Sequence, residues 1–159
     1  MTVLPKFKAF TMVWKPHVTV AAVVERDRKF LLVEEETDEG IRFNQPAGHL
    51  ERGETLLQAV VREVLEETSY TFVPDFLLGI HHWTFQQKDI TYLRFVFGGN
   101  VIAHDPEREL DEGILAAHWL TLEEILANTV RHRSPLVLRC LEDWQAGRRY
   151  PLELLAHYT

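Results

Sequence analysis

The stretch REVLEE at residues 62–67 places three glutamates at the spacing of a single helix face. Glu63, Glu66 and Glu67 stand at i, i+3 and i+4, so in a helix of about 100° per residue their side chains leave from one side. Apolar residues repeat at i, i+3, i+4 and i+7 along another side (Leu57, Val60, Val61 and Val64). We therefore expect a helix over 54–68 that packs its apolar stripe inward and turns its acidic face toward a cleft.

The apolar pattern around this helix predicts a mixed chain. β-branched runs at 17–25 and 29–36 are typical of two strands joined by a short turn. The passage 41–54, punctuated by Pro46, Gly48 and Gly53, is expected to be rich in loops. Later segments predict more strands (70–79, 80–86, 90–99 and 114–120) and two more helices (121–127 and 134–147). This order favours an α/β (α+β) fold in which one mixed β-sheet is sandwiched between helices.

Bulk properties limit the classes of function. A chain of 159 residues and 18.5 kDa predicts a single domain over 1–159. The formal charge of −7 argues against a nucleic-acid surface or an anionic membrane as partner. The one cysteine, Cys140, cannot form an internal disulfide and is expected to be a half-buried structural thiol. Residues 1–10 lack the features of a signal peptide, and no apolar run approaches the length of about 20 residues that spans a membrane, so a cytoplasmic protein is expected.

The acidic helix belongs to a longer spaced set that resembles the Nudix box, the signature of a family of phosphoanhydride hydrolases. That box reads Gly, five residues, Glu, seven residues, Arg-Glu, an apolar residue, any residue, Glu-Glu, any residue, Gly and an apolar residue. The chain matches it in spacing at eight positions (Gly48, Glu54, Arg62, Glu63, Val64, Glu66, Glu67 and Tyr70). The departure is Ser69, which stands where the box has glycine, so Ser69 is expected to end the helix with positive φ.

The resemblance implies roles for these residues. Glu63, Glu66 and Glu67 would be ligands of Mg²⁺ or Mn²⁺, and one of them would also take a proton from the attacking water. Like charges at this spacing repel, and bound divalent cations would remove that repulsion. The carbonyl oxygen of Gly48 would join the metal ligands. Two further catalytic-motif residues, Glu54 and Arg62, would form an ion pair that holds loop and helix in register.

Candidates outside the box rest on weaker patterns. Arg94, central in the strand YLRFVF, is expected either to contact a substrate phosphate or to form a structural ion pair. Gln45, beside a proline, would hydrogen-bond substrate or only shape its loop. Within the acidic loop 107–113 we favour Glu112 as an added metal ligand and expect the other acidic residues to be solvated. Residues 81–83 (HHW) would line a leaving-group pocket or have a core role.

Motifs over residues 14–155, among them FNQPAGHLERGETL and QAGRRYPLELL, are similar to the NudJ-type phosphatases within the family. That resemblance implies release of inorganic phosphate from nucleoside di- and triphosphates and from thiamine or hydroxymethylpyrimidine pyrophosphate. Aromatic residues near the expected cleft would stack tolerantly on such rings (Trp14, Phe43, Trp83 and Tyr92), which predicts broad acceptance. Two alternatives stay open: a pyrophosphohydrolase for ADP-ribose or a dinucleoside polyphosphate, and a ligand-binding module without turnover. The partner would be a small phosphorylated molecule, and the protein a monomer or homodimer.

Overall fold

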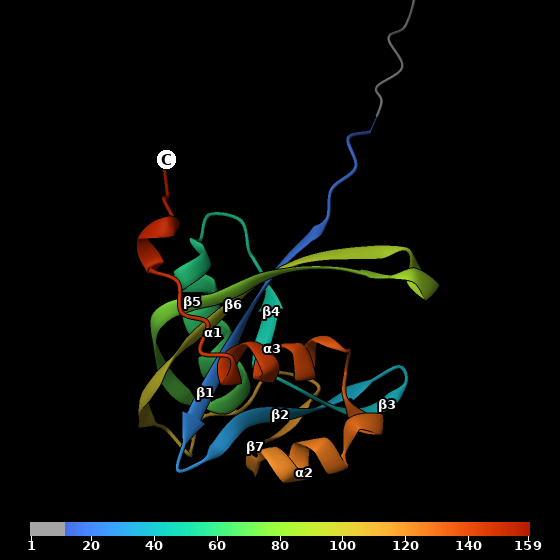
Figure 1. The fold of residues 1–159 in the computed structure, drawn as a ribbon, viewed down its shortest axis with the longest axis vertical. Helices are drawn as coiled ribbons and strands as arrows, with labels where there is room; N and C mark the ends of the chain where they lie inside the picture. The colour runs from blue at the N-terminus through green and yellow to red at the C-terminus, as the bar shows by residue number, and fades with distance from the viewer. Residues whose placement is uncertain (1–11) are drawn as a thin grey trace, which may run out of the picture.

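The computed structural model describes residues 12–159. These residues form one mixed sheet with a helix on each face (Figure 1). The segment 1–10, which bears on the signal-peptide prediction, lies outside the described residues. The strands are β1 (His17–Arg26), β2 (Lys29–Thr37), β3 (Gly40–Asn44), β4 (Ala47–His49), β5 (Tyr70–Phe85), β6 (Ile90–His104) and β7 (Ile114–Thr121). The helices are α1 (Leu56–Thr68), α2 (Leu122–Ala127) and α3 (Leu136–Gln145), with short 3-10 turns at η1 (Gln86–Lys88), η2 (Thr129–Arg131) and η3 (Leu152–Leu154). None of these helices is long and apolar enough to cross a membrane.

Strand β1 organises the sheet. The strand order is β3-β2-β1-β6-β5, with β4 paired to β1 and β7 paired to β2. β1 and β6 run parallel, and the other pairs are antiparallel. β1 pairs with β6 from His17 to Val24 and with β4 over residues 19–21, and it pairs with β2 only near the turn that joins them. The sheet is therefore split between β4 and β2, beside the loop that leads into α1.

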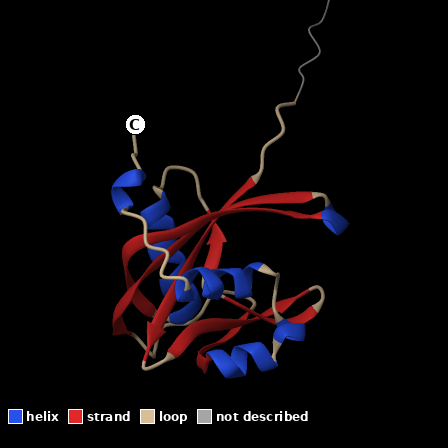
Figure 2. Ribbon diagram, in the orientation of Figure 1, coloured by secondary structure: helices blue, strands red, loops and turns tan. Residues whose placement is uncertain are grey.

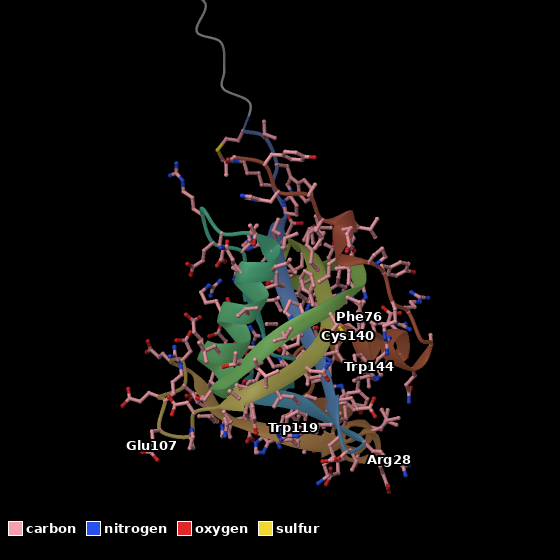
Figure 3. All side chains as sticks on the ribbon, turned by 90° about the vertical axis from the view of Figure 1, so that its left-hand side faces the viewer. Arg28, Phe76, Glu107, Trp119, Cys140 and Trp144 are labelled. Atoms are coloured by element: carbon pink, nitrogen blue, oxygen red, sulfur yellow. The ribbon has the colours of Figure 1, made fainter. Side chains whose placement is uncertain are left out.

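Alternate residues of β1 face opposite helices, which accounts for the predicted sandwich (Figure 2). Val20, Ala22 and Val24 pack in the core that includes α1, whereas Ala21 and Val23 pack in the core beneath α3. Both faces of a central strand are thus buried, as its unbroken β-branched sequence predicts. Figure 3 shows Cys140 and Trp144 of α3 on the side of the sheet opposite α1.

Cys140 is fully buried rather than half-buried. Burial raises the pKa of its thiol to about 11, so the group stays protonated and unreactive. The structural role expected for Cys140 therefore holds, in a deeper position than the sequence suggested.

Two of the predicted boundaries are wrong. Segments 70–79 and 80–86 form one strand, β5, because β6 pairs with its whole length and takes up the irregularities as bulges. The predicted strand 90–99 continues to His104 as β6. The loop-rich passage 41–54 also contains two short strands, β4 and most of β3. Their short length hid them from sequence patterns, and it is pairing with β1 and β2 that orders them.

Helix α1 begins and ends where its capping residues stand. Thr55 is the N-cap, and Thr55 and Gln58 form a reciprocal capping box. Ser69 adopts φ 60°, ψ 13°, the left-handed conformation expected at the position where the box has glycine. The capping box predicted between Thr121 and Glu124 is also present at the start of α2.

Candidate active site

Arg62 is the centre of the acidic face of α1. Its Nε and Nη2 donate to the two carboxylate oxygens of Glu54 at 3.0 and 2.7 Å, a bidentate pair. Its Nη1 donates to Glu63 at 2.8 Å and to Glu66 at 3.0 Å, and its Nη2 also reaches the carbonyl oxygen of His49 at 3.0 Å. The structure therefore places Glu54 and Arg62 in the ion pair that the resemblance implied, joining the loop to the helix.

Two of the three helix glutamates are buried. Glu67 Oε2 accepts a hydrogen bond from the Ala47 amide at 2.8 Å, which fixes its carboxyl group beneath β4. Burial raises the pKa of Glu67 to about 8, although the Ala47 amide opposes the shift. Burial also raises the pKa of Glu63, against the opposing effect of Arg62. A site that disfavours negative charge in this way gains strongly from an added cation.

Gly48 allows the backbone of β4 to lie directly against the Glu63 carboxylate. A Cβ atom at position 48 would lie 2.1 Å from Glu63 Oε1, far inside van der Waals contact. The register of β4 opposite β1, with Gly48 across from Val20, points this side of the strand toward α1. The glycine of the motif is thus required by a close approach rather than by an unusual backbone angle.

The donor types at this face suit a divalent cation, although the Arg62 guanidinium lies at the centre of the cluster. Among the residues that the structure describes, no three acidic, histidine or cysteine side chains are arranged as a metal-binding group. Arg62 Nη1 stands between Glu63 and Glu66 and neutralises both. Mg²⁺ usually takes only one or two carboxylates and keeps several waters or substrate oxygens. Carboxylates from Glu63, Glu66 and Glu67, with the Gly48 backbone beside them, could hold such an ion.

An acidic loop docks against the carboxyl end of α1. The Asp111 amide donates to the carbonyl oxygen of Glu66 at 3.0 Å, and Ser69 Oγ donates to a carbonyl oxygen of the same loop at 3.2 Å. The charge of Asp111 raises the pKa of Glu63, so Asp111 lies within electrostatic reach of the cluster. The side chains of Asp111 and of Glu112, which the sequence favoured, are both exposed to solvent. The role of Glu112 as an added metal ligand therefore stays a prediction.

Arg94 and Gln45 lie inside the protein, next to the split in the sheet. Arg94 is 6% exposed, and its Nη2 donates to Asn44 Oδ1 at 3.3 Å. Gln45 is 1% exposed, and its Nε2 donates to the carbonyl oxygen of Val137 at 2.9 Å. Arg94 Nε, Gln45 Oε1 and Glu35 Oε1 are buried without a hydrogen-bond partner. Sequence reasoning missed Glu35, whose only signal was its place in the run of acidic residues that ends the strand KFLLVEEE.

The aromatic candidates separate into covered and open rings. Phe43 is 7% exposed, and the Arg131 guanidinium lies 4.3 Å from its ring centroid, so Phe43 is a packing residue. Trp83 and Tyr92 lie side by side on the β5–β6 hairpin, with ring centroids 5.7 Å apart and planes 15° from parallel. Trp14 is mostly exposed at the start of the described chain.

His81, His82 and Trp83 line a cavity of about 740 Å³ between β5 and α3. His81 Nε2 lies 2.8 Å from Asp143 Oδ2, and Arg148 lies 3.0 Å from the other oxygen of that carboxylate. His81 is therefore tied to α3, which agrees with the core role that was left open for it.

Comparison with known proteins identifies the family. The NUDIX domain family model matches residues 15–140. Phosphatase NudJ from Escherichia coli (strain K12) is 41% identical over 146 residues, covering 92% of this chain and 94% of that protein. A NUDIX hydrolase structure from Nitrosomonas europaea is 55% identical, covers 91% of this chain and 98% of that one, and superposes with a TM-score of 0.89. A MutT NUDIX hydrolase from Burkholderia pseudomallei shares the fold at a TM-score of 0.70 and 20% identity, covering 82% of this chain and 98% of that one.

These similarities span the split sheet, the acidic helix and the loop before it. The likeness therefore includes the residues whose geometry is described above. The chain belongs to the Nudix family and is a hydrolase that acts on phosphoanhydrides.

Proposed function

We propose that this enzyme uses Mg²⁺ to remove terminal phosphate from nucleoside di- and triphosphates and from thiamine or hydroxymethylpyrimidine pyrophosphate. The observation that carries the proposal is the acidic face of α1, where Glu63, Glu66 and Glu67 surround one guanidinium beside the Gly48 backbone. Similarity to a protein named as a phosphatase supports release of inorganic phosphate over release of pyrophosphate.

The carboxylates of Glu63, Glu66 and Glu67 and the carbonyl oxygen of Gly48 would hold the ion. When bound, Mg²⁺ (or Mn²⁺) polarises the phosphorus, neutralises developing charge and acidifies a bound water. Arg62 and the Ala47 amide orient the Glu63 and Glu67 carboxylates, so the proton leaving the water passes to a positioned oxygen. The loop that docks on α1 through the Asp111 amide would supply an additional acidic residue of the site, for which Glu112 remains the candidate and Asp111 the neighbouring alternative.

Arg94 and Gln45 complete the proposed site on the substrate side. The charges of Arg94 and Glu67 act on one another, which supports a position of Arg94 on the phosphate side of the site. Gln45 lies two residues before Ala47, whose amide fixes Glu67. Both side chains keep hydrogen-bonding capacity unused within the protein, and that capacity suits a ligand.

Hydrolysis in ¹⁸O-labelled water tests which phosphorus is attacked. With a nucleoside triphosphate and Mg²⁺, we expect the label in free inorganic phosphate, since water would attack the terminal phosphorus. A label found only in the nucleoside monophosphate, with pyrophosphate as co-product, would contradict the proposal and favour a pyrophosphohydrolase. The Glu66→Gln variant serves as the control for phosphate released by a contaminating enzyme.

A further inference from the structure

Two exposed histidines outside the carboxylate cluster turn ring nitrogens toward one another. His17 begins β1 and His49 ends β4, and both residues are exposed. His17 Nδ1 lies 3.3 Å from His49 Nε2, and the two ring centroids are 5.5 Å apart with planes 64° from parallel. The proposed reaction uses neither ring. We call His17 and His49 the histidine pair.

The pairing of strands holds the two rings in place. His49 stands opposite Thr19 in the antiparallel pair of β1 with β4, so His17, two residues before Thr19, is its diagonal neighbour on the same face of the sheet. On the other side of β1, Tyr92 of β6 pairs with His17, and the centroids of these two rings are 5.7 Å apart. Both histidines therefore leave from paired backbone, and their separation does not depend on a loop.

The separation of the two nitrogens distinguishes a hydrogen bond from a shared metal ion. An N–H donor in a protein commonly lies about 2.7–3.2 Å from its acceptor, so 3.3 Å is long for a hydrogen bond between two rings that water can reach. Two Zn–N bonds of about 2.0–2.1 Å at a tetrahedral angle place their nitrogens about 3.3–3.4 Å apart. The histidine pair thus has the spacing of two ligands of one tetrahedral ion.

The surroundings of the histidine pair leave coordination positions open. Among residues 12–159, no third acidic, histidine or cysteine side chain completes a metal-binding group. Two protein ligands leave a tetrahedral ion two positions for water or for the oxygen of another molecule. Imidazole suits zinc, copper and nickel, whereas carboxylate and carbonyl oxygens suit Mg²⁺. The histidine pair and the carboxylates of α1 therefore favour different ions.

Strand β4 separates the histidine pair from those carboxylates. Gly48 lies against the Glu63 carboxylate on the α1 side of β4, and the side chain of the next residue, His49, leaves from the opposite side. The carbonyl oxygen of His49 accepts a hydrogen bond from Arg62 Nη2 at 3.0 Å, so the His49 backbone takes part in the hydrolytic site while its side chain does not. An ion at the histidine pair is a neighbour of the hydrolytic site and not part of it.

We propose that His17 and His49 chelate one borderline transition-metal ion, best matched by Zn²⁺, at a site separate from the Mg²⁺ site of the proposed reaction. The ligand atoms are His17 Nδ1 and His49 Nε2, the two nitrogens that face one another. Each neutral imidazole gives the lone pair of that nitrogen and carries its proton on the other one. The inference is independent of the proposed function, because it uses neither the carboxylates nor turnover.

Equilibrium dialysis of the full chain against Zn²⁺, in excess Mg²⁺ and without substrate, tests the inference. We expect saturable binding of one Zn²⁺ per chain. His17→Ala and His49→Ala should each weaken that binding at least about tenfold, since loss of even a hydrogen-bond partner of a metal ligand costs about that much. His82→Ala, which removes an exposed histidine of β5, is the matched control and should keep the wild-type affinity. Glu66→Gln should also keep it, because the carboxylates are not ligands of this ion.

Histidine ring signals in the NMR spectrum of the wild type give a second measurement, which does not depend on the folding of any variant. We expect Zn²⁺ to shift the ring signals of His17 and His49 together and to leave those of His82 in place. Unshifted signals of the histidine pair would overturn the inference, and so would wild-type zinc affinity in His17→Ala or His49→Ala. Loss of zinc binding in Glu66→Gln would place the ion at the carboxylates and would overturn it as well.

Discussion

Arg62 and Arg94 both stand among carboxylates, yet their hydrogen bonding differs sharply. Arg62 donates five hydrogen bonds, to three glutamates and a backbone carbonyl, from a side chain that is 24% exposed. Arg94 is 6% exposed, donates one hydrogen bond of 3.3 Å to Asn44 and keeps Nε unpaired. The more deeply buried arginine is therefore the less satisfied one, the reverse of what stability alone favours.

The difference separates an arginine with a structural role from one with unused hydrogen-bonding capacity. Arg62 neutralises carboxylates that would otherwise repel one another, and it ties α1 to the loop before it. The charges of Glu67 and Glu35 act on Arg94, yet within residues 12–159 Arg94 forms no ion pair with either of them. Substitutions that treat the two arginines alike should therefore give unlike results.

The largest effect is expected where the carboxylates meet the metal. Glu66→Gln keeps the shape of the side chain but removes the charge that Arg62 now balances. We expect kcat to fall by about 10²- to 10⁴-fold, equivalent to roughly 3–5 kcal/mol of barrier, measured by phosphate release at saturating Mg²⁺. Glu51→Gln, at an exposed glutamate 3.9 Å from Arg62, is the matched control and should keep near-normal activity. Near-normal turnover in Glu66→Gln would refute its role as a ligand.

Paired arginine substitutions test the comparison directly. Arg62→Met leaves Glu54, Glu63 and Glu66 without their common partner, and removing one member of such a network costs about 3 kcal/mol or more. Arg94→Met removes one long hydrogen bond and one unpaired donor, so we expect a change within about 1 kcal/mol. Chemical denaturation in chelator measures both. Equal destabilisation by the two changes would show that Arg94 is as structural as Arg62.

The burial of Glu67 predicts a pH dependence of stability in chelator. Its pKa is about 8 in the folded protein, against an ordinary value of 4.5, so the folded state holds the proton more tightly than the unfolded chain. Stability is then greatest below pH about 4.5 and falls as pH rises toward 8, by roughly 5 kcal/mol from this group. The difference in unfolding free energy between wild type and Glu67→Gln isolates that contribution. A difference that did not change with pH would mean that Glu67 is already ionised when folded.

Ser69 should give the smallest effect. Glycine would relieve the cost of positive φ, about 1 kcal/mol, but would lose the hydrogen bond from Ser69 Oγ to the Arg108 carbonyl oxygen. That bond is worth about 1 kcal/mol, so we expect Ser69→Gly to change the unfolding free energy by less than about 1 kcal/mol. Thermal unfolding measures the change, and kcat should stay close to that of the wild type. A large loss of activity would indicate that the acidic loop depends on Ser69 for its position.

The local parts of the fold could be read from the chain. Helix α1 follows from the apolar repeat of Leu57, Val60 and Val64, and its end follows from the glycine position that Ser69 occupies. The double-sided burial of β1 follows from its β-branched sequence. The ion pair of Glu54 with Arg62 was predicted from the resemblance to the Nudix box. The partners stand eight positions apart, so the pair depends on the course of the loop that leads into the helix.

The acidic loop shows where local reading stops. Asp111 and Glu112 are chemically alike and adjacent, and only the fold shows that the loop docks on α1 through the hydrogen bond from the Asp111 amide to the carbonyl oxygen of Glu66. The same holds for β5. The sequence predicts two strands there, whereas pairing with β6 along the whole length makes them one strand. In both cases the deciding partner is distant in sequence.

The sequence by itself determined the helix, its acidic face, the family and the class of reaction, because these depend on the spacing of residues within one short segment. Only the tertiary structure decided that Phe43 is covered while Glu35, Gln45 and Arg94 each hold a buried polar atom without a hydrogen-bond partner. Those residues come from β2, the passage before β4, and β6, and their environment depends on burial and on partners that folding brings together. Burial sets the cost of every unpaired polar group, and it is a property of the packed molecule rather than of any one segment.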